Sequence, residues 1–169
     1  MAKKYSQLEL EDAYKLFILL NQTSDALRKL RQRDLEVSEI TMEQAATLIC
    51  VKNLGKEATS SELSKWLFRE PNTITSLVNG LEKRGLIRRE VSQENKTIKK
   101  LILTEEGEKC LEQTSDLEFL YNSILKLTPK KQEQLKSILE VLKEHSFRSL
   151  GLDAADYTHF RDIPIKFSD

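Results

Sequence analysis

Short polar side chains dominate one helical stretch of the chain, residues 71–84, and their types suit contact with nucleic acid. Asparagine, serine and threonine carry donors and acceptors on short stems, so a helix bearing them can approach base edges and phosphates closely. An ordinary solvated helix surface has a similar composition, and this feature alone leaves that alternative open. The candidate DNA contacts on this helix are Asn72, Thr73, Thr75, Ser76, Asn79 and Lys83.

A basic β-hairpin is predicted directly after this helix. Residues 86–91 and 97–103 favour strands, and the polar residues 92–96 between them favour a turn. Lys96 then lies at the tip, and a cationic tip fits the narrow, strongly negative minor groove of DNA. Solubility and protection of a strand edge are the alternative explanation. The legs carry Arg88, Arg89, Lys99 and Lys100, and we select Arg88, Lys96, Thr97 and Lys99 as candidate contacts.

The charge distribution agrees with a DNA-contacting segment in the middle of the chain. The 169 residues carry 27 basic and 27 acidic side chains, which argues against a uniformly basic nucleic-acid binder. Residues 56–104 hold 10 basic and 6 acidic side chains, whereas residues 105–169 hold 9 and 13. A basic segment, a polar helix face and an adjoining lysine-tipped hairpin together point to DNA.

The elements that must position these residues are mostly helices. A helical apolar period over about residues 8–35 predicts one long helix with apolar side chains on more than one face. Thr41 is expected to cap a second helix, which Gly55 ends. Residues 59–62 have the form of a reciprocal capping box that opens a short helix, and Pro71 suits the first turn of the polar helix. Ser60 and Ser61, at the start of the short helix, join the candidate DNA contacts.

Two further helices are predicted after the hairpin. Thr104 is expected to cap a long helix that runs to about Lys126. Thr128 and Pro129 open the last helix, and Gly151 lies just past its end. The tail, residues 152–169, receives no regular structure, but its apolar residues predict packing on a partner subunit or in a crevice of its own chain, with a frayed terminus as the alternative.

Several classes of function are disfavoured by what the sequence lacks. It has no apolar run of membrane-spanning length, no signal peptide, no glycine-rich phosphate loop and no histidine with a partnered nucleophile. Cys50 and Cys110 are expected to be buried thiols, and His145 and His159 to be surface or interface residues without metal. We therefore expect a cytoplasmic protein that is not an enzyme, has no cofactor or metal and binds no membrane.

The segment from residue 58 to residue 107 resembles the winged-helix core of the MarR (multiple antibiotic resistance regulator) family. The flanking helices and the start at Leu127-Thr128-Pro129 extend the resemblance over about residues 8–148. The motifs that carry it are Thr59-x-x-Glu62-Leu63, Thr73-Ile74-Thr75, Leu81-Glu82-Lys83-Arg84-Gly85-Leu86-Ile87 and Leu103-Thr104-Glu105-Glu106-Gly107.

The resemblance implies a mainly α fold with a small β-hairpin wing, a winged helix-turn-helix flanked by long dimerisation helices. Residues 1–40 and 104–150 would form the helical dimerisation region, 41–103 the DNA-binding lobe and 151–169 an irregular tail. It implies a homodimer on double-stranded DNA, with each polar helix in a major groove and each wing at a minor groove. Family members often respond to small ligands or oxidants, and a crevice between the dimer helices and the lobe is the implied ligand site.

This sequence departs from the family pattern at two candidate contacts. Asn95-Lys96 occupies the wing-tip positions where the family often has Asp-Arg, and lysine lacks the planar fork of arginine, so minor-groove reading should be weaker. Ser76 stands where many members carry arginine, which removes a candidate guanine contact. An oxidant-sensing branch has a reactive cysteine near the start of the first helix, and no cysteine occurs there in this chain.

The expected function is sequence-specific DNA binding by a homodimeric transcriptional regulator. By analogy with the family we expect a repressor that binds a pseudo-palindromic operator and is released by a small-molecule effector. The alternative is a winged-helix module for protein contacts within a transcription or replication complex. That alternative requires an exposed apolar surface on residues 71–84, where the sequence offers polar side chains.

Overall fold

The computed structural model describes residues 5–114 and 117–153 and confirms a mainly helical fold with one two-stranded hairpin. The tail hypothesis for residues 152–169 and the expectation for His159 fall almost entirely outside the described residues. In chain order the elements are α1 (Gln7–Asp34), α2 (Met42–Leu54), α3 (Ser60–Leu67), α4 (Pro71–Lys83), β1 (Ile87–Val91), β2 (Lys99–Leu103), α5 (Glu105–Gln113), α6 (Glu118–Tyr121) and α7 (Pro129–Ser149).

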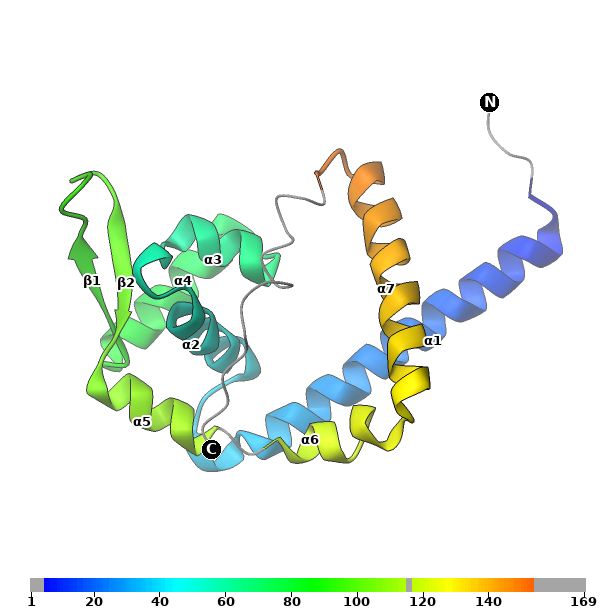
Figure 1. Ribbon diagram of the computed structural model, residues 1–169, viewed down its shortest axis with the longest axis horizontal. Coiled ribbons are helices and arrows are strands. Elements are labelled where there is room, and N and C mark those ends of the chain that lie inside the picture. The colour runs from blue at the N-terminus through cyan, green and yellow to red at the C-terminus, as the bar shows by residue number, and fades with distance from the viewer. Residues whose placement is uncertain (1–4, 115–116, 154–169) are drawn as a thin grey trace.

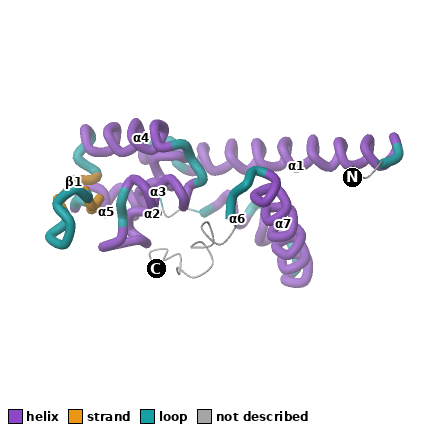
Figure 2. The backbone as a smooth tube through the Cα atoms, turned by 90° about the horizontal axis from the view of Figure 1, so that it is seen from above, coloured by secondary structure: helices purple, strands orange, loops and turns teal. Residues whose placement is uncertain are grey.

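The helices form a lobe with a long arm beside it. Figure 1 shows α2, α3, α4 and the hairpin gathered at one end, with α5 beneath them. Viewed from above, the N-terminal half of α1 projects far beyond the lobe, and α7 runs across the direction of α1 (Figure 2). The chain thus separates a packed head from two long helices that reach away from it.

The hydrophobic core lies within the lobe. Its buried side chains come from the stretch between Leu35 and Leu111, and Leu48, Leu63, Ile74 and Leu81 are fully inaccessible. Each such side chain contributes roughly 2 kcal/mol to stability through the apolar surface it removes from water. β1 and β2 are antiparallel, with Ile87 opposite Leu103 and Val91 opposite Lys99, and Ile87 and Leu101 turn inward to close the core.

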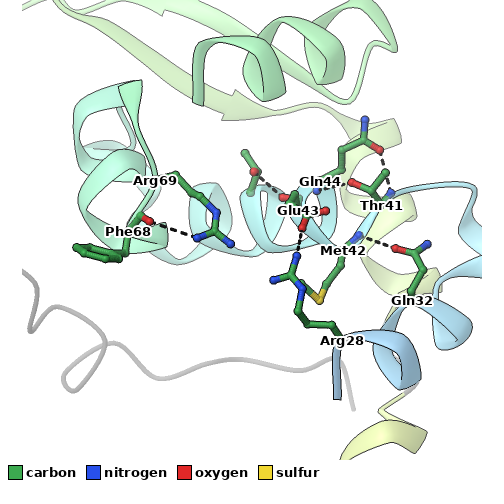
Figure 3. A network of polar contacts seen from close by, with 9 residues as sticks. Arg28, Gln32, Thr41, Met42, Glu43, Gln44, Phe68 and Arg69 are labelled. Carbon is green, nitrogen blue, oxygen red and sulfur yellow. Dashed lines mark hydrogen bonds and ion pairs between the residues drawn. The ribbon is translucent and has the colours of Figure 1, made fainter. Parts of the chain in front are cut away.

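Polar contacts fasten α1 to the start of α2 (Figure 3). The Thr41 hydroxyl accepts from the Gln44 amide at 3.2 Å, and the Gln44 side chain accepts from the Thr41 amide at 3.0 Å, which completes a capping box. From α1, the Gln32 side-chain oxygen accepts from the Met42 amide at 3.1 Å, and Arg28 pairs with Glu43. The predicted cap at Thr41 is confirmed, and the same turn anchors the arm to the lobe.

The reciprocal capping box expected at residues 59–62 is only half formed. The Thr59 hydroxyl accepts from the Glu62 amide at 3.2 Å, as predicted. The Glu62 carboxylate instead accepts from the Lys65 ammonium at 3.1 Å, one turn further along α3. An ion pair on the helix surface therefore replaces the second hydrogen bond of the box.

The prediction of one long helix from Thr104 to about Lys126 is wrong. α5 ends at Gln113, and the chain continues through the short α6 and a single 3-10 turn at Ile124–Lys126 before α7. At the break, the Thr114 carbonyl accepts from the Arg31 guanidinium at 3.0 Å. The Phe119 amide donates to the Asp34 carboxylate at 2.9 Å, so contacts with α1 hold both sides of the break.

Apolar side chains on α1 and α7 remain exposed in the single chain. Ile138 on α7 is 65% exposed and Leu16 on α1 is 67% exposed. The predicted apolar stripe of the last helix is present and lies on the surface. Its members are Leu135, Ile138, Leu139 and Leu142.

Candidate nucleic-acid interface

Helix α4 is held by one apolar face and presents the other to solvent. Pro71 begins it without the loss of a hydrogen bond, because the first amides of a helix have no partner within the helix. Ile74, Val78 and Leu81 are fully buried beneath it. The predicted polar side chains all lie on the exposed face: Asn72, Thr73, Thr75, Ser76, Asn79 and Lys83.

Two of these polar side chains are already engaged within the protein. The Thr75 hydroxyl donates to the Pro71 carbonyl at 2.9 Å, so this side chain can offer DNA only an acceptor. The Asn79 side-chain oxygen accepts from the Arg89 guanidinium at 2.7 Å, which ties the helix to β1. The sequence placed both residues on the correct face but could not show which of their atoms remain available.

The hairpin projects beside α4, and Asn95 shapes its tip. The Asn95 side-chain oxygen accepts from the Thr97 amide at 3.0 Å and from the Thr97 hydroxyl at 2.7 Å. Asn95 therefore stabilises the turn that carries Lys96, and both the amide and the hydroxyl donor of Thr97 are used within this turn. Lys96 itself is exposed at the tip, as predicted.

The basic side chains of the hairpin legs divide between solvent and the lobe. Arg88 is exposed and pairs with Glu90 on the same strand, which partly neutralises it. Arg89 pairs with Glu82 of α4, and the Lys100 ammonium nitrogen lies 3.7 Å from a carboxylate oxygen of Glu57. In the described part of the chain, no carboxylate lies within ion-pair distance of Lys83, Lys96 or Lys99, which leaves these ammonium groups available to phosphate.

A groove separates α3 from the hairpin and contains several candidate contacts. Ser60 and Ser61 line it from the first turn of α3, and Thr97 and Lys99 line it from the hairpin. Glu57 and Glu62 also line the groove, but they pair with Lys100 and Lys65, and the hydroxyl and ammonium groups on opposite walls suit a phosphate backbone that passes between them. The structure thus brings the serines next to the wing, a proximity that their sequence separation does not show.

Both cysteines are buried, as predicted. Burial, reinforced by the negative charge of Glu62, raises the pKa of the Cys50 thiol to about 12. Burial also raises the pKa of the Cys110 thiol, with a smaller opposing effect from Arg84. Because the thiolate is the reactive form, these environments suppress nucleophilic and redox chemistry at both sulfurs.

Residues 5–114 and 117–153 contain neither a metal-binding cluster nor a membrane-spanning helix. No group of three or more histidine, cysteine or carboxylate side chains there could hold a metal ion. No helix among the same residues has the length and apolar character that a membrane crossing demands.

Sequence reasoning missed two contacts that bear on α4. Arg89 was recognised as a basic leg of the hairpin but not as a partner of Asn79. Phe68, in the turn before α4, stacks on Phe147 of α7 with ring centroids 4.8 Å apart and an interplanar angle of 19°. No local signal could have revealed either pair, because each joins separate elements whose proximity depends on the fold.

Comparisons with known proteins agree with this geometry. Residues 40–99 match the profile of the MarR family. The organic hydroperoxide resistance transcriptional regulator of Bacillus subtilis (strain 168) is 27% identical over 144 residues, which cover 85% of this chain and 96% of that protein.

Solved structures share the fold. Sco3205 of Streptomyces coelicolor, a MarR family transcriptional regulator in complex with DNA, has a TM-score of 0.73 at 21% identity, over 85% of this chain and 91% of that chain. The organohalide-sensing regulator RdhR-CbdbA1625, bound to 2,4-dichlorophenol, has a TM-score of 0.69 at 23% identity, over 86% of this chain and 88% of that chain.

Proposed function

This chain belongs to the MarR family of DNA-binding winged-helix transcriptional regulators, and from that premise we propose that it is a homodimeric repressor released by a small ligand. The family consists of regulators and not of enzymes. The observation that carries the proposal is the exposed polar face of α4 beside a hairpin with a lysine tip. Its site of action would be the cytoplasm, where the regulated DNA is transcribed.

The operator is proposed to be an inverted repeat. Two copies related by a two-fold axis present two α4 helices, so the half-sites should lie about one helical turn apart. Selecting bound fragments from genomic DNA, followed by a salt titration of the best fragment, tests this. A DNA reader loses affinity steeply with salt because phosphate contacts release counterions. A protein indifferent to duplex DNA at low ionic strength would instead favour a module for protein contacts.

Lys96→Ala is expected to weaken binding to all DNA sequences about equally and to reduce the slope of log affinity against log salt by about one. The reason is that Lys96 is exposed at the wing tip and contributes a point charge, not a base-reading fork. Fluorescence anisotropy on operator and unrelated duplexes over a range of salt concentrations measures both effects. A change in which bases are preferred would contradict the phosphate-contact role.

The dimer is proposed to form through α1 and α7. Both helices expose large apolar side chains, among them Leu16 and Phe17 on α1 and Ile138 on α7. Exposed large apolar side chains in this number mark an interaction site, and a second copy of the chain provides the matching surface. α1 and α7 lie in the proposed dimerisation residues 1–40 and 104–150, whereas α5, whose Cys110 and Leu111 join the core, packs with the proposed DNA-binding lobe at 41–103.

Release by a ligand requires a physical connection between α7 and the DNA-reading helix, and the stacked rings of Phe68 and Phe147 supply one. A groove between the end of α7 and the lobe is lined by Phe68, Pro71, Leu150 and Leu152, among others. Polar and charged side chains, among them Lys65, Arg69 and Glu70, complete the lining, and a small molecule in this groove would change how α7 meets the turn before α4. It would act only through different affinities for the DNA-competent and DNA-incompetent arrangements.

Oxidant sensing through the cysteines is not part of the proposal. With the pKa of Cys50 at about 12 and that of Cys110 raised, both thiols stay protonated at pH 8. We expect Cys50 to react at least about 100-fold more slowly than a free cysteine with Ellman's reagent, Cys110 also to react more slowly, and both to react readily in urea. A fast-reacting thiol in the native protein, with loss of DNA binding on oxidation, would overturn this prediction.

A further inference from the structure

Arg89 bridges two side chains on the exposed face of α4. One terminal nitrogen of its guanidinium donates to the Asn79 side-chain oxygen at 2.7 Å, and the other pairs with the Glu82 carboxylate. Asn79 and Glu82 are three residues apart and are therefore neighbours on the helix surface. The Arg89 side chain is only 24% exposed, so this bridge is partly shielded from solvent.

The chemistry of arginine fixes the orientation of the Asn79 amide. A guanidinium has donors and no acceptor, so the atom of Asn79 that faces it must be the oxygen. The amide nitrogen then points away from Arg89. Among the described residues none accepts from it, and the side chain of Asn79 is exposed.

This orientation limits what Asn79 can read. The usual recognition of adenine by asparagine is bidentate: the side-chain oxygen accepts from N6 and the side-chain nitrogen donates to N7. Here the oxygen is held by a charge-assisted hydrogen bond, so the outward group is a donor. Guanine suits an outward donor better, because it presents two adjacent acceptors, O6 and N7, in the major groove.

We infer that Arg89 is a positioning residue: it holds the Asn79 side chain so that its amide nitrogen points outward as a donor. Asn79 would then prefer a guanine at the base pair that it faces. The inference deepens the proposed function, since it requires α4 to enter the major groove. A purely structural Arg89 would only hold the wing against α4, and its loss would then weaken binding to all sequences alike. The diagnostic quantity is therefore the base preference at one position of each half-site.

The experiment selects bound sites from a randomised duplex library with the full-length protein and its variants. Wild type should prefer guanine at one position of each half-site. Glutamine ends two bonds short of the arginine nitrogen that reaches Asn79, so Arg89→Gln removes this hydrogen bond. Asn79→Ala and Arg89→Gln should each reduce that preference about fivefold, and the double variant should reduce it no further, because both changes remove the same interaction. Arg89→Lys, which keeps a donor near the Asn79 oxygen, should retain part of the preference.

Arg88→Gln is the matched control, because it removes the same charge from the adjacent, exposed position of β1. It should lower affinity for all sequences and leave the guanine preference intact. If Arg89→Gln also keeps the preference and lowers affinity uniformly, the inference is wrong while the proposed function survives. If wild type enriches no sequence at all, the proposed function itself fails.

A measurement without DNA tests the hydrogen bond directly. In the nuclear magnetic resonance spectrum, the side-chain amide protons of Asn79 should exchange with water faster, and their shifts should move, in Arg89→Gln relative to wild type. Unchanged shifts and exchange would overturn the inference whatever the selection shows. If Arg89→Gln does not fold, Arg89→Lys serves in both measurements. Its base preference should then lie between those of wild type and Asn79→Ala, and Asn79 amide protons that shift while the base preference keeps its wild-type value would overturn the inference.

Discussion

Replacing Ile138 by aspartate is expected to split the dimer and to weaken operator binding by about 100-fold. Ile138 is 65% exposed in the single chain, so the substitution leaves the core of the lobe intact. In the proposed dimer the new carboxylate would be buried without a partner, which strongly disfavours association. Each lobe would then bind its half-site alone and lose the effective concentration that linkage to a second lobe provides.

Sedimentation velocity gives the oligomeric state of Ile138→Asp, and fluorescence anisotropy on the selected operator gives its affinity. Ser137→Asp is the matched control: it adds the same charge at the neighbouring exposed position, on the side of α7 away from the stripe that contains Leu135, Ile138 and Leu142. The control should stay dimeric. A dimeric Ile138→Asp protein with unchanged affinity would rule out this face of α7 as the subunit interface.

Gly107→Ala is expected to destabilise the lobe by about 3 kcal/mol. A Cβ on Gly107 would lie 2.0 Å from the Leu86 carbonyl oxygen and 3.4 Å from Leu103 Cδ2. The Leu86 oxygen cannot withdraw easily, because it accepts from the Thr104 amide at 3.2 Å, and Thr104 caps α5 through its bond from the Gly107 amide at 3.0 Å. The first turn of α5 would have to move off the start of β1.

Gly80→Ala makes the same chemical change but should raise the free energy of unfolding, whereas Gly107→Ala should lower it. Gly80 lies inside α4, and the nearest atom to its added Cβ is the Gln44 side-chain nitrogen at 4.0 Å, an ordinary contact. With no clash, alanine should stabilise the helix by about 0.5 to 1 kcal/mol. Urea unfolding at one fixed protein concentration measures both free energies. Equal effects from the two substitutions would show that close approach at Gly107 does not limit stability.

Helix starts and the order of the elements in the lobe could be predicted from the sequence because they depend on neighbouring residues. The caps at Thr41, Thr59 and Thr104 each use a hydroxyl that reaches an amide three residues ahead. The change of period after Gly85 likewise predicted a hairpin, which the structure shows as β1 and β2. The polar face of α4 followed from the spacing of Ile74, Val78 and Leu81 alone.

The exposure of the candidate contacts was predicted residue by residue, but the availability of their individual atoms was not. Asn79, Lys96 and Lys99 are exposed where the sequence placed them. Which donors and acceptors remain available was decided by partners on other elements, such as Arg89 for Asn79. Even the Thr75 hydroxyl, whose partner is one helical turn away, could donate to the Pro71 carbonyl or to solvent. Only the structure shows that it donates to the carbonyl.

The end of α5 shows most clearly where local information stops. The helical period of the sequence favoured one helix to Lys126, yet the chain leaves the helix at Thr114. There the Thr114 carbonyl accepts from Arg31, and beyond the break the Phe119 amide donates to Asp34. Hydrogen bonds between residues more than eighty positions apart have no signature in a helical period. The sequence thus determined where helices begin and which faces they bury, because those choices involve adjacent residues. Where α5 ends, how Asn79 is oriented and how closely Gly107 approaches Leu86 were decided only when distant segments packed together.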